Sequence, residues 1–183
     1  KAGRFLEQSK GKDVILFSGH GHASHYYQLS SLMFSDDVLF AHEIMSHKKH
    51  FTDSSTVILS ACETGAQDRR ILDQHLGLMS AFHIAGASIV ISTLWKVHDI
   101  CSTMVTTGLV SELSNGHDPI TALTKSTSRL KTSSLRDIEE FLEIDLRKLD
   151  PKLAKCNPSK KYFEHPLYWS PFIATGRLAC DPE

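Results

Sequence analysis

Three short apolar runs along the chain predict the strands of a parallel sheet. They span residues 13–18, 56–61 and 87–94, and each is an almost unbroken series of aliphatic and small side chains. Unbroken apolar runs are typical of strands that are covered on both faces, as the strands of parallel sheets are. In half-exposed strands, apolar and polar residues alternate. We therefore expect three parallel strands at the centre of an α/β fold.

The segments between and after these runs carry helical patterns. A long polar loop follows the first run, and Gly86 is a stop signal for the helix before the third run. The predicted helices span 41–47, 74–84, 99–113, a stretch that starts near Asp118-Pro119, and 135–149. A loop over 150–166 and a final antiparallel strand over 167–175 complete the prediction, which is a three-layer sandwich with helices flanking a mainly parallel sheet.

Composition and charge exclude several classes of protein. The chain has 183 residues, of which 41% are hydrophobic and 22% charged, as in ordinary globular proteins rather than disordered ones. A net charge of -1 leaves no basic stripe, so nucleic acid is not an expected partner. No apolar run reaches the roughly 18 residues of a membrane span. Because the chain starts at Lys1 and has no signal peptide, we expect a piece of a longer precursor.

The four cysteines indicate reduced thiols rather than a disulfide framework. They contain no C-x-x-C pair, which argues against a zinc ribbon, and they are Cys62, Cys101, Cys156 and Cys180. Reduced thiols are typical of cytoplasmic proteins, so we expect that location.

A histidine and a cysteine stand at the ends of the first two predicted strands. His20 lies in the segment Gly19-His20-Gly21-His22, and Cys62 directly follows the second run. Ligands of open α/β sheets bind at the carboxyl ends of strands, and neighbouring strands are about 4.8 Å apart, so the two side chains can share one site. Histidine is a usual activator of a thiol, and the N–H groups of Gly21 and Cys62 could hold an oxyanion. The alternative is a buried cysteine and a structural histidine.

Several motifs, in order, resemble those of the CHAT domain, a caspase-like cysteine peptidase family related to separase. The most specific combination is Leu59-Ser60-Ala61-Cys62-Glu63-Thr64-Gly65 followed about thirty residues later by Ser92-Thr93-Leu94-Trp95. The resemblance runs over residues 13–176, and the other segments that carry it are 14–21, 77–87, 96–99 and 168–172.

The resemblance implies a caspase-like fold and a cysteine endopeptidase in which His20 is the catalytic histidine and Cys62 the nucleophile. It implies Gly21 and Cys62 as oxyanion donors and no metal or organic cofactor. It also implies a specific protein substrate in a regulated death or defence pathway. By the same resemblance, residues 1–183 are the catalytic, carboxyl-terminal part of a CHAT peptidase domain. Its upstream strands would come from the same precursor or a companion chain, and a helical-repeat region would regulate it.

Three further residues are candidates for substrate binding. The resemblance to separases implies that Asp99 contacts a basic side chain before the cleaved bond, and a carboxylate suits an arginine there. Asp99 could instead cap the helix that follows it. Glu63 could line the same pocket or orient a loop, and Trp95 could form a wall of the cleft or belong to the core.

Two rival functions remain open. His20, His22 and His25 resemble the H-x-H-x-D-H signature of zinc hydrolases, although Ser24 replaces the expected aspartate. A non-catalytic CHAT-like interaction module is the second rival, and such modules usually lose the cysteine or the histidine. We interpret Cys101 as structural.

Overall fold

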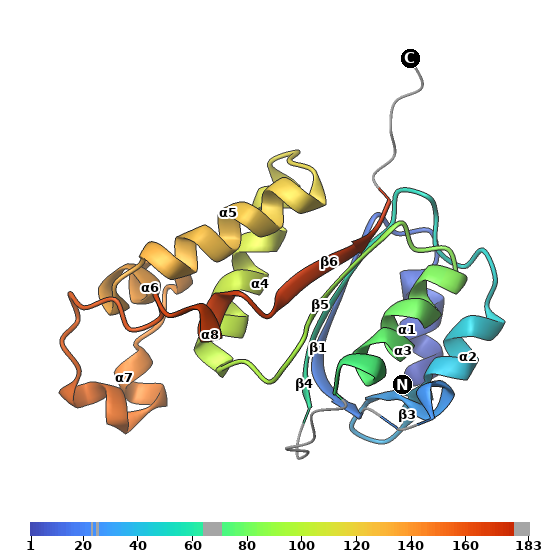
Figure 1. Cartoon of the computed structure of the whole chain (residues 1–183), viewed down its shortest axis with the longest axis horizontal. Helices are drawn as coiled ribbons and strands as arrows, with labels where there is room; N and C mark the ends of the chain where they lie inside the picture. Colours follow the sequence, from blue (N-terminus) through green and yellow to red (C-terminus); the bar gives the residue numbers. More distant parts are fainter. Residues whose placement is uncertain (23, 25, 64–70, 178–183) are drawn as a thin grey trace. The chain divides into compact units, whose positions relative to one another are not determined.

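A six-stranded sheet with the strand order β3-β2-β1-β4-β5-β6 organises one part of the chain (Figure 1). The strands are β1 (Val14–His22), β2 (Ser31–Met33), β3 (Val38–Phe40), β4 (Thr56–Glu63), β5 (Ile89–Thr93) and β6 (Phe172–Gly176). β1, β4 and β5 pair in parallel, and β2, β3 and β6 run antiparallel to their neighbours. The predicted α/β class, the parallel centre and the antiparallel last strand are confirmed.

The computed structural model describes residues 1–22, 24, 26–63 and 71–177. The chain forms two compact units. The first unit contains residues 1–96 together with the segment from Phe172 onward and holds the whole sheet. The second unit contains residues 97–171 and is helical.

Three helices cover one face of the sheet in the first unit (Figure 1). They are α1 (Ala2–Ser9), α2 (Ala41–Ser46) and α3 (Ile71–Ile84), and a short 3₁₀ helix, η1 (Tyr27–Leu29), precedes β2. Their apolar side chains pack on alternate residues of the strands in one core, whose members include Leu6, Ile15, Phe17, Ile44, Val57, Leu59, Phe82 and Val90. Gly86 ends the α3 segment with φ +111°, and a Cβ there would lie 2.6 Å from the Phe51 carbonyl oxygen.

The apolar runs that predicted the strands are not equally buried. All five residues of β5 are buried, as expected for a strand covered on both faces. In β1, Ile15 and Phe17 are buried, but Val14 and Leu16 are 43% and 41% exposed. The prediction of full burial was therefore wrong for β1, because an apolar run does not by itself reveal whether a second layer covers each residue.

Several predicted boundaries need correction. The first two strands extend past their apolar runs, so His20 and Cys62 lie within β1 and β4 rather than in loops. The segment 23–40, predicted as a loop, contains η1 and the β2–β3 hairpin, and α1 was not predicted. Both hairpin strands have three residues, which is too short for a periodic signal.

The second unit is built from helices that mostly carry their own start signals. Its elements are α4 (Asp99–Ser114), α5 (Pro119–Thr132), α6 (Leu135–Leu142), α7 (Leu146–Leu149), the 3₁₀ helix η2 (Pro151–Lys155) and α8 (Pro166–Trp169). Asp118 accepts hydrogen bonds from the N–H groups of Ile120 and Thr121, which confirms the predicted start of α5.

Two elements predicted after residue 134 have other boundaries than expected. The helix expected over 135–149 divides into α6 and α7, because Glu143 adopts a left-handed conformation (φ 54°) and Asp145 caps a new helix. The segment expected as a strand from residue 167 begins as α8, with Pro166 at its first position and His165 as its cap. Only residues 172–176 of that segment form a strand.

A buried carboxylate joins α4 to α5. Glu112 accepts hydrogen bonds from the Lys125 Nζ (3.1 Å) and from an Arg129 nitrogen (2.9 Å), and its side chain is 8% exposed. The hydrogen bond from Lys125 lowers the pKa of Glu112, against the opposing effect of burial. The Arg129 guanidinium also lies 4.5 Å from the centroid of the Phe141 ring, so this network reaches α6 as well.

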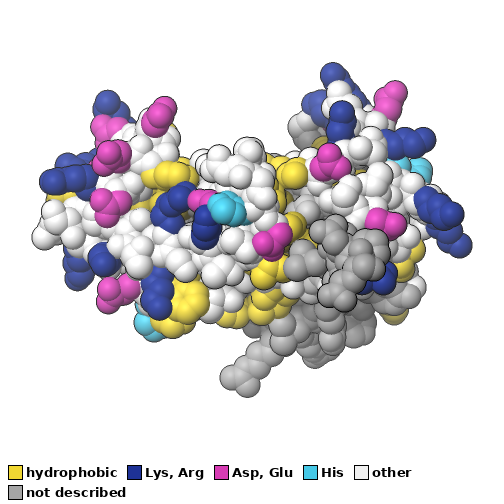
Figure 2. Space-filling view, turned by 90° about the horizontal axis from the view of Figure 1, so that it is seen from above, with side chains coloured by type: hydrophobic (Ala, Val, Ile, Leu, Met, Phe, Trp, Pro, Cys, Tyr) yellow, Lys and Arg dark blue, Asp and Glu magenta, His cyan; other side chains and the backbone are white. Residues whose placement is uncertain are grey.

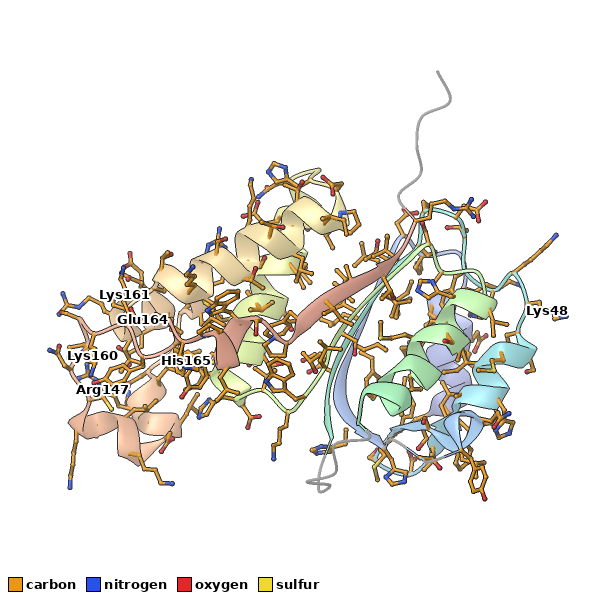
Figure 3. All side chains as sticks on the ribbon, viewed as in Figure 1. Lys48, Arg147, Lys160, Lys161, Glu164 and His165 are labelled. Carbon is orange, nitrogen blue, oxygen red and sulfur yellow. The ribbon has the colours of Figure 1, made fainter. Side chains whose placement is uncertain are left out.

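Charged side chains of both signs are mixed on the surface. On the face shown in Figure 2, Lys and Arg side chains are interspersed with Asp and Glu side chains. In the second unit, Arg147, Lys160 and Lys161 lie at the same end as Glu164 (Figure 3). Among the described residues, no helix is both long and apolar enough to cross a lipid bilayer.

Candidate active site

His20 and Cys62 occupy paired positions on neighbouring parallel strands. β1 and β4 pair without a slip from Val14↔Thr56 to Gly21↔Glu63, and this register places His20 opposite Cys62. Paired positions of neighbouring strands lie on one face of a sheet, with the strands about 4.8 Å apart. The structure thus brings the predicted histidine and cysteine positions together through backbone pairing over the length of both strands.

An aromatic cluster supports the strand just before His20. The Phe17 ring makes edge contacts with Phe5 (6.0 Å between centroids) and Phe34 (5.4 Å). A Cβ at Gly19 would lie 3.0 Å from the Phe17 ring, so a glycine suits this close approach. Phe17 therefore anchors β1 in the core two residues before Gly19, while His20 is exposed on the sheet.

Two of the other predicted residues lie directly beside this pair. Gly21 is buried in β1 and pairs with Glu63 of β4 on one side and with Leu32 of β2 on the other. Glu63 is the last residue of β4. Both candidates are thus one position further along the strands than His20 and Cys62.

The remaining two candidates follow β5. Trp95 is half-buried in the segment after this strand. Asp99 is exposed and is the first residue of α4, whose cap is His98: the His98 Nδ1 accepts a hydrogen bond from the Ile100 N–H (3.3 Å). Capping therefore does not occupy the Asp99 carboxylate, which has no hydrogen-bond or ion-pair partner among the described residues.

A pocket of about 440 Å³ in the second unit contains Asp99. Asp150 supplies a second carboxylate, and no lysine or arginine is among the lining residues described. The rest of the lining is mostly aliphatic and includes Ile100, Leu142, Ile144, Leu146 and Leu149. Apolar walls with carboxylates suit a long basic side chain, whose methylene stem is apolar and whose head is positive. Asp150 was not predicted from the sequence.

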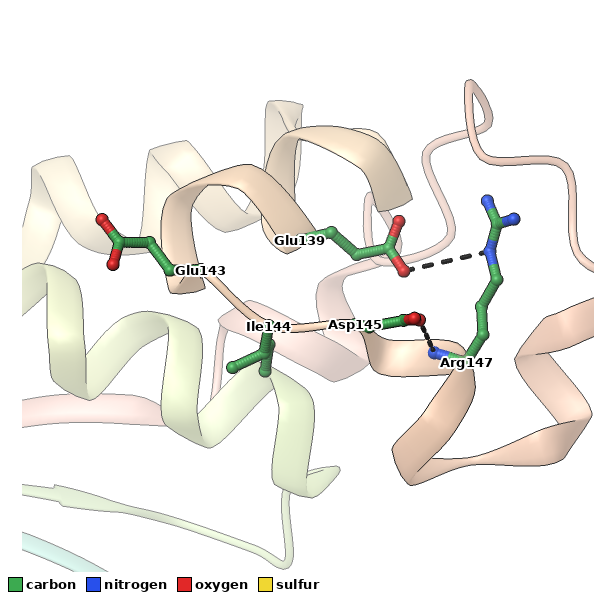
Figure 4. A pocket seen from close by; sticks show the side chains of 5 residues that line it. All are labelled: Glu139, Glu143, Ile144, Asp145 and Arg147. Carbon is green, nitrogen blue, oxygen red and sulfur yellow. Dashed lines mark hydrogen bonds and ion pairs between the residues drawn. The ribbon is translucent and has the colours of Figure 1, made fainter.

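A second, more open pocket in the same unit has its charges largely paired (Figure 4). Glu139 and Arg147 form an ion pair (Oε1 to Nε, 3.9 Å), and Asp145 accepts a hydrogen bond from the Arg147 N–H (3.2 Å). Ile144 lies between these groups and Glu143. These contacts stabilise the start of α7, and we assign no ligand to this pocket.

The buried Cys101 thiol differs from what a nucleophile needs. Cys101 is buried in α4, and burial raises the pKa of its thiol to about 12, which keeps it protonated at neutral pH. This supports its interpretation as a structural residue. Cys156 lies half-buried after η2, and Cys180 lies outside the described residues.

The rival zinc site cannot be assembled from the described residues. His20 and His22 are both exposed on β1, but His25, the third residue of the predicted set, lies outside the described residues. Within the described ranges, no three histidine, cysteine, aspartate or glutamate side chains gather in a way that could hold a metal ion.

Comparison with known proteins supports the resemblance seen in the sequence. A search of curated proteins finds no match to the chain. The family model described as CHAT domain matches residues 3–177, which is nearly the whole chain. The chain therefore belongs to the CHAT family, a caspase-like family related to cysteine peptidases.

Proposed function

We propose that this chain is a cysteine endopeptidase with a caspase-like three-layer fold, in which Cys62 is the nucleophile and His20 the general acid and base. The observation that carries the proposal is the pairing of His20 with Cys62 on adjoining parallel strands in a member of the CHAT family. A thiol needs a base within reach to become a nucleophile, and the paired position of His20 supports that role.

The mechanism starts when the imidazole of His20 takes the proton of the Cys62 thiol. The thiolate sulfur bonds to the carbonyl carbon of the substrate, and the N–H groups of Gly21 and Cys62 donate hydrogen bonds to the resulting oxyanion. The C–N bond then breaks, and His20 gives its proton to the leaving amine. Water attacks the thioester with His20 as base, the C–S bond breaks, and the acid product leaves with the thiol restored.

Asp99 is the residue that we propose for binding a basic side chain before the cleaved bond. Its support is the pocket that contains Asp99 and Asp150 between aliphatic walls. An arginine can bind a carboxylate through two parallel hydrogen bonds. Trp95 and Glu63 are proposed as further substrate contacts, since Glu63 directly follows Cys62 in β4 and Trp95 lies just after β5, the next strand of the sheet.

The proposed substrate is a specific protein of the cytoplasm, cleaved in a regulated death or defence pathway. The other proposed partners are the upstream part of the precursor or a companion chain, and a helical-repeat region that regulates cleavage. The β1 edge supports the first of these. In the part of the chain that the structure describes, β2 pairs only with residues 20–22 of β1, which leaves residues 14–19 without a strand on that side. An open strand edge can accept an added strand.

The direct test is a positional-scanning peptide library incubated with the wild type and with Cys62→Ala, His20→Ala and Asp99→Asn. We expect loss of at least about 10³-fold in kcat/KM for the first two variants. Asp99→Asn should lower the preference for arginine or lysine before the cleaved bond. Cys156→Ala is the matched cysteine control and should cleave like the wild type. Cleavage that survives Cys62→Ala would contradict the peptidase mechanism and favour a metal site, whereas absence of any cleavage by the wild type would favour an interaction module.

A further inference from the structure

We propose that Met33 and Val38 form an apolar subsite for a substrate side chain on the leaving-group side of the cleaved bond. This inference rests on the proposed peptidase function. It concerns the β2–β3 hairpin, which the sequence did not predict.

The hairpin continues the row of residues that contains the reacting pair. Cys62 pairs with His20 across β4 and β1, His20 pairs with Met33 across β1 and β2, and Met33 pairs with Val38 across β2 and β3. Paired positions share a face of the sheet, and each strand adds about 4.8 Å. Met33 is therefore about 10 Å and Val38 about 14 Å from the Cys62 position along this row.

The two side chains form an exposed apolar pair on that face. Met33 is 45% exposed and Val38 is 36% exposed, whereas the alternate residues Leu32 and Leu39 are buried in the core on the opposite face. β3 is the edge strand of the sheet, so the row ends there (Figure 1). Single exposed apolar residues are common on proteins, but here two adjacent ones continue directly from His20.

The acidic side chains of the hairpin are held by partners of their own. Asp36 and Asp37 are in the turn between the strands, where Asp36 pairs with the Lys1 side-chain ammonium (3.5 Å) and Asp37 accepts a hydrogen bond from the Ala2 N–H (3.1 Å). The Asp37 carboxylate also accepts a hydrogen bond from the Val38 N–H (2.9 Å). Since these acids are already paired, the chemistry offered by Met33 and Val38 is apolar, and it suits a leucine, methionine or similar side chain.

The proposed chemistry sets the direction in which the substrate lies. His20 protonates the leaving amine, so the segment after the cleaved bond must run from Cys62 toward His20. Continued in the same direction, that segment passes over Met33 and then Val38. An extended peptide advances about 3.4 Å per residue, so these positions correspond to about the second to fourth residue after the bond. Met33 and Val38 would thus contact side chains of the amine product, which is released when the peptide bond breaks.

The test uses peptides with one fixed sequence before the bond and either leucine or serine at each of the first four positions after it. The wild type should prefer leucine over serine at one of the second to fourth positions by about tenfold in kcat/KM. Val38→Thr and Met33→Gln should reduce that ratio toward one by lowering kcat/KM for the leucine peptide. Val110→Thr is the matched control, since Val110 is 37% exposed on α4, and it should keep the wild-type ratio.

The outcomes separate this subsite from the peptidase function. Cleavage that depends on Cys62 but shows no apolar preference at those positions would overturn the subsite alone. If Val38→Thr and Met33→Gln lower kcat/KM equally for the leucine and serine peptides, the subsite is also overturned, because the hairpin would then only support His20. Absence of any Cys62-dependent cleavage by the wild type would overturn both proposals. Unchanged circular dichroism spectra should accompany each variant.

Discussion

The two units of this chain hold their candidate functional residues in different ways. In the first, His20 and Cys62 are 42 residues apart in the sequence and meet because two strands pair in one register. In the second, Asp99 is the first residue of α4, and a local cap sets where this helix begins. Ion pairs with the buried Glu112 join α4 to α5. The proposed reaction chemistry in the first unit therefore depends on long-range pairing, whereas the candidate specificity pocket depends on helix ends.

The largest effect should come from opening a cavity under the sheet. Phe82 is fully buried in α3 against the strand core, so Phe82→Ala should lower the free energy of unfolding by about 3–5 kcal/mol. Ile84, two residues later and 51% exposed, is the control. Ile84→Ala should change the free energy of unfolding by less than about 0.5 kcal/mol. Urea unfolding of both variants measures the difference, and equal values would show that α3 does not carry the core.

Two glycines test how closely each unit is packed at its turns. Gly86 has φ +111° and lies against the Phe51 carbonyl, so Gly86→Ala adds a clash to the backbone strain and should cost more than about 2 kcal/mol. Gly116 has φ +83° but open space around it, so Gly116→Ala should cost only about 1 kcal/mol. Thermal unfolding compares the two, and a larger loss at Gly116 would contradict this reading of the packing.

A cap in the second unit should have a smaller effect. Ser134 accepts a hydrogen bond from the Asp137 N–H at the start of α6, and the Asp137 carboxylate bonds back to the Ser134 N–H. Ser134→Ala should therefore cost about 1 kcal/mol. Ser128→Ala, at an exposed position within α5, should be neutral or slightly stabilising. If both serines respond alike in chemical denaturation, local capping does not specify the start of α6.

Mild acid should weaken the first unit before the second. Burial lowers the pKa of His50, whose ring bonds to the Leu6 carbonyl, so the stability tied to its neutral form is complete above about 6.5 and declines as the pH falls below that value. The hydrogen bond from Lys125 lowers the pKa of Glu112, so its contribution persists down to about 4.5 and is lost only at lower pH.

Hydrogen exchange, corrected for intrinsic rates, can measure this difference at about pH 7.5 and 5.5. Peptides from α1 and from residues 47–51 should lose protection at the lower pH, and peptides from α4 and α5 should not. His50→Gln should remove the pH dependence in the first unit. Loss of protection in both units together would show that His50 is not its source.

The sequence predicted what depends on local pattern. The apolar runs placed the parallel strands, Gly86 marked the end of α3, and Asp118-Pro119 marked the start of α5. It failed where local signals are short or compete: the β2–β3 hairpin has three residues per strand, and α8 begins at Pro166 inside an aromatic segment that also suits a strand. The resemblance identified the family because its motifs are specific.

For the candidate site, the identities of His20 and Cys62 came from the sequence, and so did the expectation that they meet. Their register did not, because strand pairing is decided by the packing of both faces and by contacts across many residues. The same holds for Asp150, which lines the same pocket as Asp99, and for Met33, which pairs with His20 across β1 and β2. The sequence thus determines the residue types and most of the local elements, whereas contacts between residues of different strands and helices form only when the chain folds.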